Sequence, residues 1–204
     1  MRRLFLGLFA MIAFAFAASA QTADEIIARM DKEVEKGETK GLAMTMSMKI
    51  PVVGEFSSRI KSLGDNSYAE SMVKGEKIQI WSDKKTNWTY NSKGNEVVIE
   101  NSKAGDNNEQ DMVKGLTEGY KATLKKETVD TWVIKCDKLK SNEDKDDPNT
   151  MDLVVSKETY LPVRLSTKIK MVKVSMTNFT IGVSPEEVKY DPSAFKDAKI
   201  TDKR

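Results

Sequence analysis

The sequence predicts a mainly β protein with a few helices, in which an antiparallel sheet of about ten strands curls or closes incompletely and is covered by helices. Three observations lead to this prediction. Leu42–Ile50 alternates between apolar and small or polar residues without a slip. Further short segments with the same period of two follow, and turn signals separate them, which is typical of an antiparallel meander rather than of βαβ units. Only two segments have the apolar spacing of amphipathic helices.

Leu42–Ile50 carries the strongest strand signal, and its composition is unusual because three of its five apolar residues are methionines. Val, Ile, Phe and Tyr fit a pleated surface better. Methionine is flexible and polarizable, and it adapts to variable apolar partners. The pattern alone therefore fits either a core strand with gap-filling methionines or a strand that lines a ligand site.

Residues 1–20 have the features of a secretory signal peptide. Arg2 and Arg3 precede an apolar run, and Ala18-Ser19-Ala20 supplies small residues for cleavage. The run is short for a retained membrane anchor, and no cysteine follows the cleavage site. We expect residues 21–204 to form one domain outside the cytoplasm, in the periplasm.

The charge balance and two residue counts exclude several function classes. Without Arg2 and Arg3, the 33 basic residues become 31, equal to the 31 acidic residues. The mature chain therefore lacks the basic excess of a nucleic-acid-binding protein. Histidine is absent, which removes Ser-His-Asp triads and most zinc sites. Cys136, the one cysteine, is in phase with Trp132 and Ile134, and we expect it to be a buried structural thiol.

The N-terminal part of the mature chain predicts one helix and then a meander. Thr22 and Glu25 form a capping box, Ile26, Ile27, Met30 and Val34 make one apolar stripe, and Gly37 can end the helix. After Leu42–Ile50, the strand pattern recurs at residues 55–63, 67–74, 76–82, 85–90 and 95–100.

The second part of the chain predicts one more helix and further strands. The composition of residues 103–108 predicts a polar loop. Apolar residues at 109–120 have helical spacing, although Gly115 and Gly119 lower the helix propensity of this segment. Strands are expected at 121–126, 129–139, 151–155 and 161–165, and a longer run at 168–183 changes phase after Met171, which indicates a turn or bulge. The acidic segment 141–149 lacks the glycine and terminal glutamate of an EF-hand, so we expect a solvated loop. An irregular polar segment begins at Ser184.

Ile80–Asn91 resembles a motif of the LolA-like periplasmic carriers of outer-membrane lipoproteins. In that family a strand ending in Ser-Asp-Gly-Lys turns into a strand that bears Trp-x-Tyr. Here Ser82-Asp83-Lys84-Lys85 and Trp88-x-Tyr90 occupy those places, and Pro185–Pro192 is similar to the closing segment of the family. The order of the elements also fits over most of the mature chain.

The sequence departs from the family at two places. Proteobacterial relatives carry an Arg-Pro pair where the second strand ends, and that arginine closes the cavity. The equivalent place here, near Ser62-Leu63, has no such pair, and the strand that follows has Tyr68 as its one aromatic residue. The latch, and the details of transfer to a receptor, therefore cannot be carried over.

The resemblance implies a half-open β-barrel with a helical lid around a hydrophobic cavity for acyl chains. It implies a periplasmic carrier that ferries lipoproteins toward the outer membrane, as a monomer without cofactor or metal. Acylated lipoproteins or other lipid tails are the expected partners, and an inner-membrane transporter and an outer-membrane receptor are further candidates. The residues that we expect to line the cavity are Met44, Met46, Met48, Phe56, Ile60, Tyr68, Met72, Ile78, Ile80 and Trp88.

Two other functions remain open at this point. The same fold could serve as an envelope sensor or as a lipid- or protein-binding module without a transport role. An enzyme is the third possibility, and Glu70, between Tyr68 and Met72, is its one candidate acid or base. We do not expect catalysis.

Overall fold

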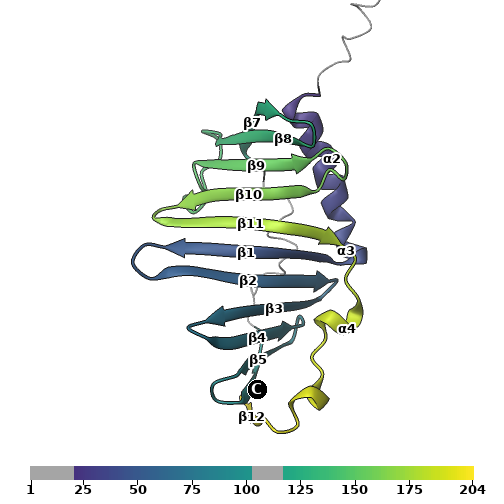
Figure 1. Ribbon diagram of the computed structural model, residues 1–204, viewed down its shortest axis with the longest axis vertical. Helices are drawn as coiled ribbons and strands as arrows, with labels where there is room; N and C mark the ends of the chain where they lie inside the picture. The colour runs from purple at the N-terminus through teal and green to yellow at the C-terminus, as the bar shows by residue number, and fades with distance from the viewer. Residues whose placement is uncertain (1–20, 103–116) are drawn as a thin grey trace, which may run out of the picture.

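The computed structural model describes residues 21–102 and 117–204, and in these residues twelve strands form one sheet (Figure 1). The strand order is β12-β6-β5-β4-β3-β2-β1-β11-β10-β9-β8-β7. All neighbours are antiparallel except β12 and β6, which are parallel. The sheet is curled and not closed, as predicted for a half-open barrel.

The strands match the expected segments closely. Their bounds are β1 Leu42–Ile50, β2 Gly54–Leu63, β3 Asn66–Val73, β4 Glu76–Ser82, β5 Thr86–Asn91, β6 Glu96–Asn101, β7 Tyr120–Glu127, β8 Thr131–Lys138, β9 Thr150–Ser156, β10 Pro162–Ile169, β11 Val172–Ile181 and β12 Lys199–Asp202. The phase change after Met171 is a turn between β10 and β11, because Ile169 pairs with Val172. The parallel strand β12 was not predicted.

Helix α2 (Ala23–Glu35) is the predicted N-terminal helix, and its capping box is present. The Glu25 amide donates to the Thr22 hydroxyl at 3.2 Å, and the Thr22 amide donates to the Glu25 carboxylate at 3.0 Å. The predicted stripe of Ile26, Ile27, Met30 and Val34 is buried. A short helix, α3 (Gly37–Lys40), then leads into β1.

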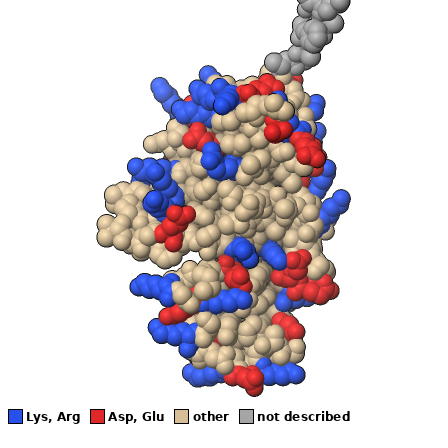
Figure 2. Space-filling view, viewed as in Figure 1, with Lys and Arg blue, Asp and Glu red and all other residues tan. Residues whose placement is uncertain are grey.

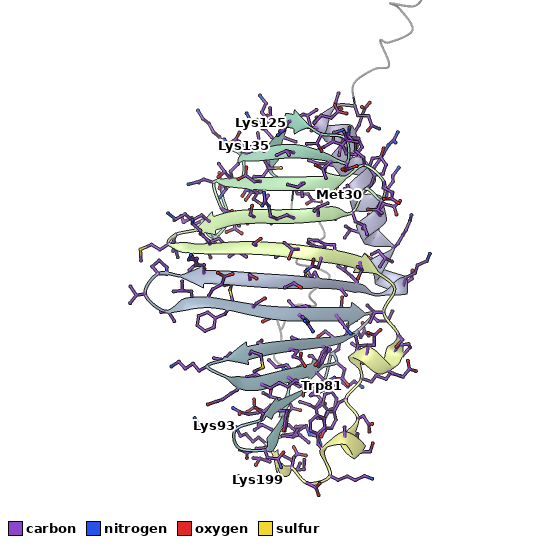
Figure 3. All side chains as sticks on the ribbon, in the orientation of Figure 1. Met30, Trp81, Lys93, Lys125, Lys135 and Lys199 are labelled. Carbon is purple, nitrogen blue, oxygen red and sulfur yellow. The ribbon has the colours of Figure 1, made fainter. Side chains whose placement is uncertain are left out.

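The stripe of α2 packs against one side of the sheet, which we call the methionine face because it carries Met44, Met46 and Met48 of β1. The helix lies along the half of the sheet that contains β8–β11, where Figure 3 labels Met30. The buried sheet residues of this core are Leu42, Met44, Ile60, Trp132, Ile134, Cys136, Met151, Leu153, Val155, Leu165, Met176 and Phe179. Cys136 is fully buried among them, as predicted.

The C-terminal segment covers the opposite side of the other half of the sheet. It comprises α4 (Pro185–Val188), a 3-10 turn η1 (Pro192–Phe195) and β12. We call this side the aromatic face, because Trp81, Trp88 and Tyr90 meet Tyr190 and Phe195 there, and Tyr68 packs on Trp81. Figure 3 shows Trp81 beside this segment.

Three predictions concern residues outside the described part. These are the signal peptide at 1–20, the polar loop at 103–108 and most of the helix at 109–120. Tyr120, the last residue of that predicted helix, begins β7 instead. In residues 21–102 and 117–204 no helix has the length and apolar character needed to cross a membrane.

Candidate functional site

Strand register separates the ten predicted cavity residues into two groups. Met44 pairs with Ile60, Ile60 with Ala69, and Ala69 with Ile80, and directly paired residues project from the same side of a sheet. With their neighbours two residues away, this row defines the methionine face of β1–β4. The predicted residues on this face are Met44, Met46, Met48, Phe56, Ile60, Ile78 and Ile80.

Tyr68, Met72 and Trp88 lie on the aromatic face, which corrects the expectation that all ten residues share one side. Tyr68 pairs with Trp81, and Trp81 pairs with Trp88, so this row alternates with the row of Met44. The reason is that the C-terminal segment covers this side of β3–β6. Large apolar residues therefore occur on both sides of these strands, and period two alone cannot tell which side faces a ligand.

Burial on the methionine face decreases along β1. Met44, close to α2, is 4% exposed, Met46 is half-buried, and Met48 is 38% exposed. Across the sheet, Phe56 and Ile78 are half-buried and Ile80 is 39% exposed. These five residues, Met46, Met48, Phe56, Ile78 and Ile80, form what we call the open apolar surface.

A strip of small side chains runs between the large residues of the open apolar surface. Ser58 of β2 and Ala69 and Ser71 of β3 separate the methionines from Ile78 and Ile80. The Ser58 and Ser71 hydroxyls hydrogen-bond to each other at 2.8 Å. Because the two hydroxyls are paired with each other, apolar contact with this strip costs less free energy than contact with two unpartnered hydroxyls would. A low strip with large apolar residues on both sides fits an extended hydrocarbon chain.

Ser58, Ala69 and Ser71 were not among the cavity residues predicted from the sequence. The signal was available, because Ser67, Ala69 and Ser71 alternate in β3 as regularly as the methionines alternate in β1. Small residues at this spacing indicate a binding strip, because a hydrocarbon chain needs space as well as apolar contact.

Glu70 on the aromatic face belongs to a hydrogen-bonded network. Lys77 pairs with its carboxylate at 2.8 Å, and the Tyr68 hydroxyl donates to it at 2.9 Å. Gln79 donates to the Tyr68 oxygen at 2.7 Å. The hydrogen bond from Lys77 is the main cause that lowers the pKa of Glu70, and burial raises the pKa of Tyr68 to about 12. Glu70 is thus an ionised, partnered carboxylate at neutral pH.

The aromatic residues of the family-like motif hold the C-terminal segment on the sheet. Trp88 stacks on Tyr190 with ring centroids 5.4 Å apart, and Tyr90 contacts Phe195 at 4.8 Å. Trp81 meets Phe195 edge to face at 5.4 Å. Trp88 therefore has a structural partner, and its place in the motif is explained without a ligand.

No family model and no curated protein matches the chain. Solved structures do. An uncharacterized conserved protein from Thermus thermophilus is 17% identical, with a TM-score of 0.50 over 90% of this chain and 100% of that one. LprF from Mycobacterium bovis is 12% identical, also with a TM-score of 0.50, over 82% of this chain and 97% of that one.

LprF has a LolA-like fold, and the similarity shows that this chain has that fold too. A LolA superfamily protein from Nitrosomonas europaea is 11% identical, with a TM-score of 0.36 over 85% of this chain and 100% of that one. At such identities the comparison establishes the fold alone.

Proposed function

We propose that the protein is a periplasmic carrier that binds lipoprotein acyl chains on the open apolar surface and ferries them toward the outer membrane. The observation that carries this proposal is the arrangement of large residues around the small strip of Ser58, Ala69 and Ser71 on a LolA-like sheet. The proposal involves no chemistry on the cargo and no cofactor.

Hydrocarbon burial supplies enough free energy for this role. Each buried methylene contributes about 0.8 kcal/mol, so a sixteen-carbon chain gains about 12 kcal/mol when it is fully enclosed. A chain lying on a surface that is open on one side gains about half of that amount. An intermediate affinity suits a carrier, because the cargo must be held in transit and then released. The flexible side chains of Met46 and Met48 can adapt to chains of different shape.

Neighbouring serines on β2 provide the test. Ser58 lies on the methionine face and bonds to Ser71, whereas Ser57 lies on the other side and accepts a hydrogen bond from Ser47. Binding of a fluorescent palmitoylated peptide is measured by anisotropy for Ser58→Phe and for the matched control Ser57→Phe. Filling the small strip should weaken binding about tenfold or more, since it removes more than about 1.4 kcal/mol of apolar contact. The control should bind as the unmodified protein does.

The outcomes distinguish this function from the alternatives. Equal binding by both variants, or no binding by the unmodified protein, would reject the carrier. Lipid extraction and native mass spectrometry of protein purified from its own periplasm should also find an acylated ligand. If a stable complex with a membrane-anchored signalling protein is recovered in place of lipid, the sensor function holds instead.

A further inference from the structure

We propose that the tips of the β1–β2 and β10–β11 hairpins form a docking surface for an anionic phospholipid bilayer. The two tips lie side by side, because β1 pairs with β11. In Figure 1 they project beyond the neighbouring hairpins at the same edge of the sheet. This surface is separate from the open apolar surface, and the proposal does not depend on acyl-chain binding.

The tips expose large apolar side chains. Val52 is fully exposed, Val53 is 63% exposed and Met171 is 71% exposed. Figure 2 shows the projecting tip without charged atoms at its end. Apolar residues gathered at the end of a projection can enter the interface of a bilayer, where burial of their side chains strengthens binding.

Backbone strain accompanies the exposure of Val52. It follows Pro51 in the turn and has a φ of +68°, a conformation that glycine or asparagine usually supplies in turns. A β-branched residue at positive φ is a genuine outlier. The turn thus keeps an exposed valine at a position where glycine would be more stable, which points to a use for the side chain.

Lysines lie directly behind the tips. Lys49 pairs with Lys173, and Lys173 pairs with Lys168, so three ammonium groups share one row of the sheet, which Glu55 ends on the β2 side, opposite Lys49. Lys170 is in the β10–β11 turn. Like charges placed opposite each other are destabilising unless an anion is near. The ion pairs within residues 21–102 and 117–204 involve other lysines.

The surroundings of the lysine row suit a phosphate headgroup. The row borders a hollow of about 450 Å³ that Ser166 and Ser175 also line, so hydroxyl donors lie beside the ammonium groups. Glu55 and Asp152 border the same hollow. With three lysines and two carboxylates around it, the hollow has a positive net charge. The acidic loop between β8 and β9 lies one hairpin away, and in Figure 1 it is set back from the tips. A protein partner with an acidic surface would meet the lysines equally well, but it would not require apolar side chains at the end of a projection.

The test measures sedimentation of the mature chain with vesicles of phosphatidylglycerol and phosphatidylethanolamine, compared with vesicles of phosphatidylcholine. The unmodified protein should bind the anionic vesicles, and added salt should weaken binding because it screens the lysines. Lys168→Gln with Lys173→Gln should weaken it about fivefold for each lysine removed. Val52→Gly with Val53→Ser should weaken it about tenfold or more, because both apolar side chains are lost from the interface. The double variant Val52→Gly with Val53→Ser, which we call the tip variant, should fold, since glycine adopts the strained φ of residue 52 readily.

Val129→Gly is the matched control. Val129 is also an exposed turn valine, but its turn, between β7 and β8, lies at the opposite ends of the strands from the tips (Figure 1). It should bind vesicles like the unmodified protein. Three results would overturn the proposal. The control and the tip variant could lose vesicle binding equally, the unmodified protein could fail to bind vesicles, or it could bind both vesicle types equally. Ser58→Phe should still bind vesicles, and the tip variant should still bind the soluble acylated peptide, which separates this proposal from the carrier function.

Discussion

At the scale of single residues, the side of the sheet on which a group lies determines its chemistry. Cys136 lies on the methionine face inside the core, and burial raises the pKa of its thiol to about 11. Glu70 lies on the aromatic face, where Lys77 keeps its carboxylate ionised. Neither environment is that of a reactive group, since a nucleophilic thiol needs a lowered pKa and a general acid needs a raised one.

The Cys136 thiol should be unreactive in the folded protein. Ellman's reagent at pH 8 should modify it only as fast as the protein unfolds, and at once in guanidinium chloride. Because the folded pKa is raised, the neutral thiol favours the folded state at neutral pH, and this contribution declines as the pH rises from the usual pKa of 9.0 toward 11. Rapid modification of the native protein would contradict the buried position.

Glu70→Gln should leave binding of the palmitoylated peptide unchanged and should make the stability of the fold less sensitive to acidic pH. The lowered pKa of Glu70 means that its ion pair stabilises the fold at neutral pH, and that this stabilisation is lost as the pH falls through the folded value. Thermal melting from neutral to acidic pH measures the difference between the two proteins. Loss of peptide binding in the variant would instead place Glu70 in the functional site.

At the scale of elements, α2 depends on its N-terminal cap. Thr22→Ala removes the hydroxyl that accepts from the Glu25 amide, and should lower the free energy of unfolding by about 1 kcal/mol. Thr39→Ala is the control, because the Thr39 hydroxyl is exposed and makes only a long 3.4 Å hydrogen bond. Urea unfolding followed by circular dichroism measures both, and equal effects would show that the cap does not contribute.

The C-terminal segment depends on Trp81, which contacts Tyr68, Tyr190 and Phe195. Trp81→Ala should lower stability by about 3 kcal/mol and should expose the segment to trypsin at Lys189 and Lys196. Trp132→Ala, which removes a buried tryptophan from the methionine face, should destabilise the protein without selective cleavage there. Equal cleavage in both variants would show that the aromatic contacts do not hold the segment.

These elements show what the sequence could and could not predict. The Thr22 cap, the stripe of α2 and most strand bounds follow from local patterns, and the structure has them. The orientation of Tyr68, Met72 and Trp88 depends on a segment about 100 residues later that covers the other side of the same strands. Strand β12 has only four residues and gains its partner through this segment, so it has no pattern of its own.

At the scale of the whole molecule, the two sides of the sheet are covered at different ends. Helix α2 covers the methionine face over β8–β11, and the C-terminal segment covers the aromatic face over β3–β6 (Figure 1). The part of the open apolar surface on β4, Ile78 and Ile80, therefore lies on a strand that the C-terminal segment covers from behind, whereas its part on β1 lies between the two covered regions. Such support would keep the proposed binding surface in shape, and Met48 and Ile80 are exposed on its own side.

Photo-crosslinking can locate a bound acyl chain on the protein directly. A palmitoylated peptide with a diazirine near the end of its acyl chain is bound to the protein, and the complex is irradiated. Mass spectrometry then maps the residues to which the acyl chain has become attached. The expected result is attachment to the open apolar surface, at Met46, Met48, Phe56, Ile78 or Ile80. Attachment on the aromatic face around Trp81 and Tyr190, or no attachment above a non-acylated control peptide, would contradict it.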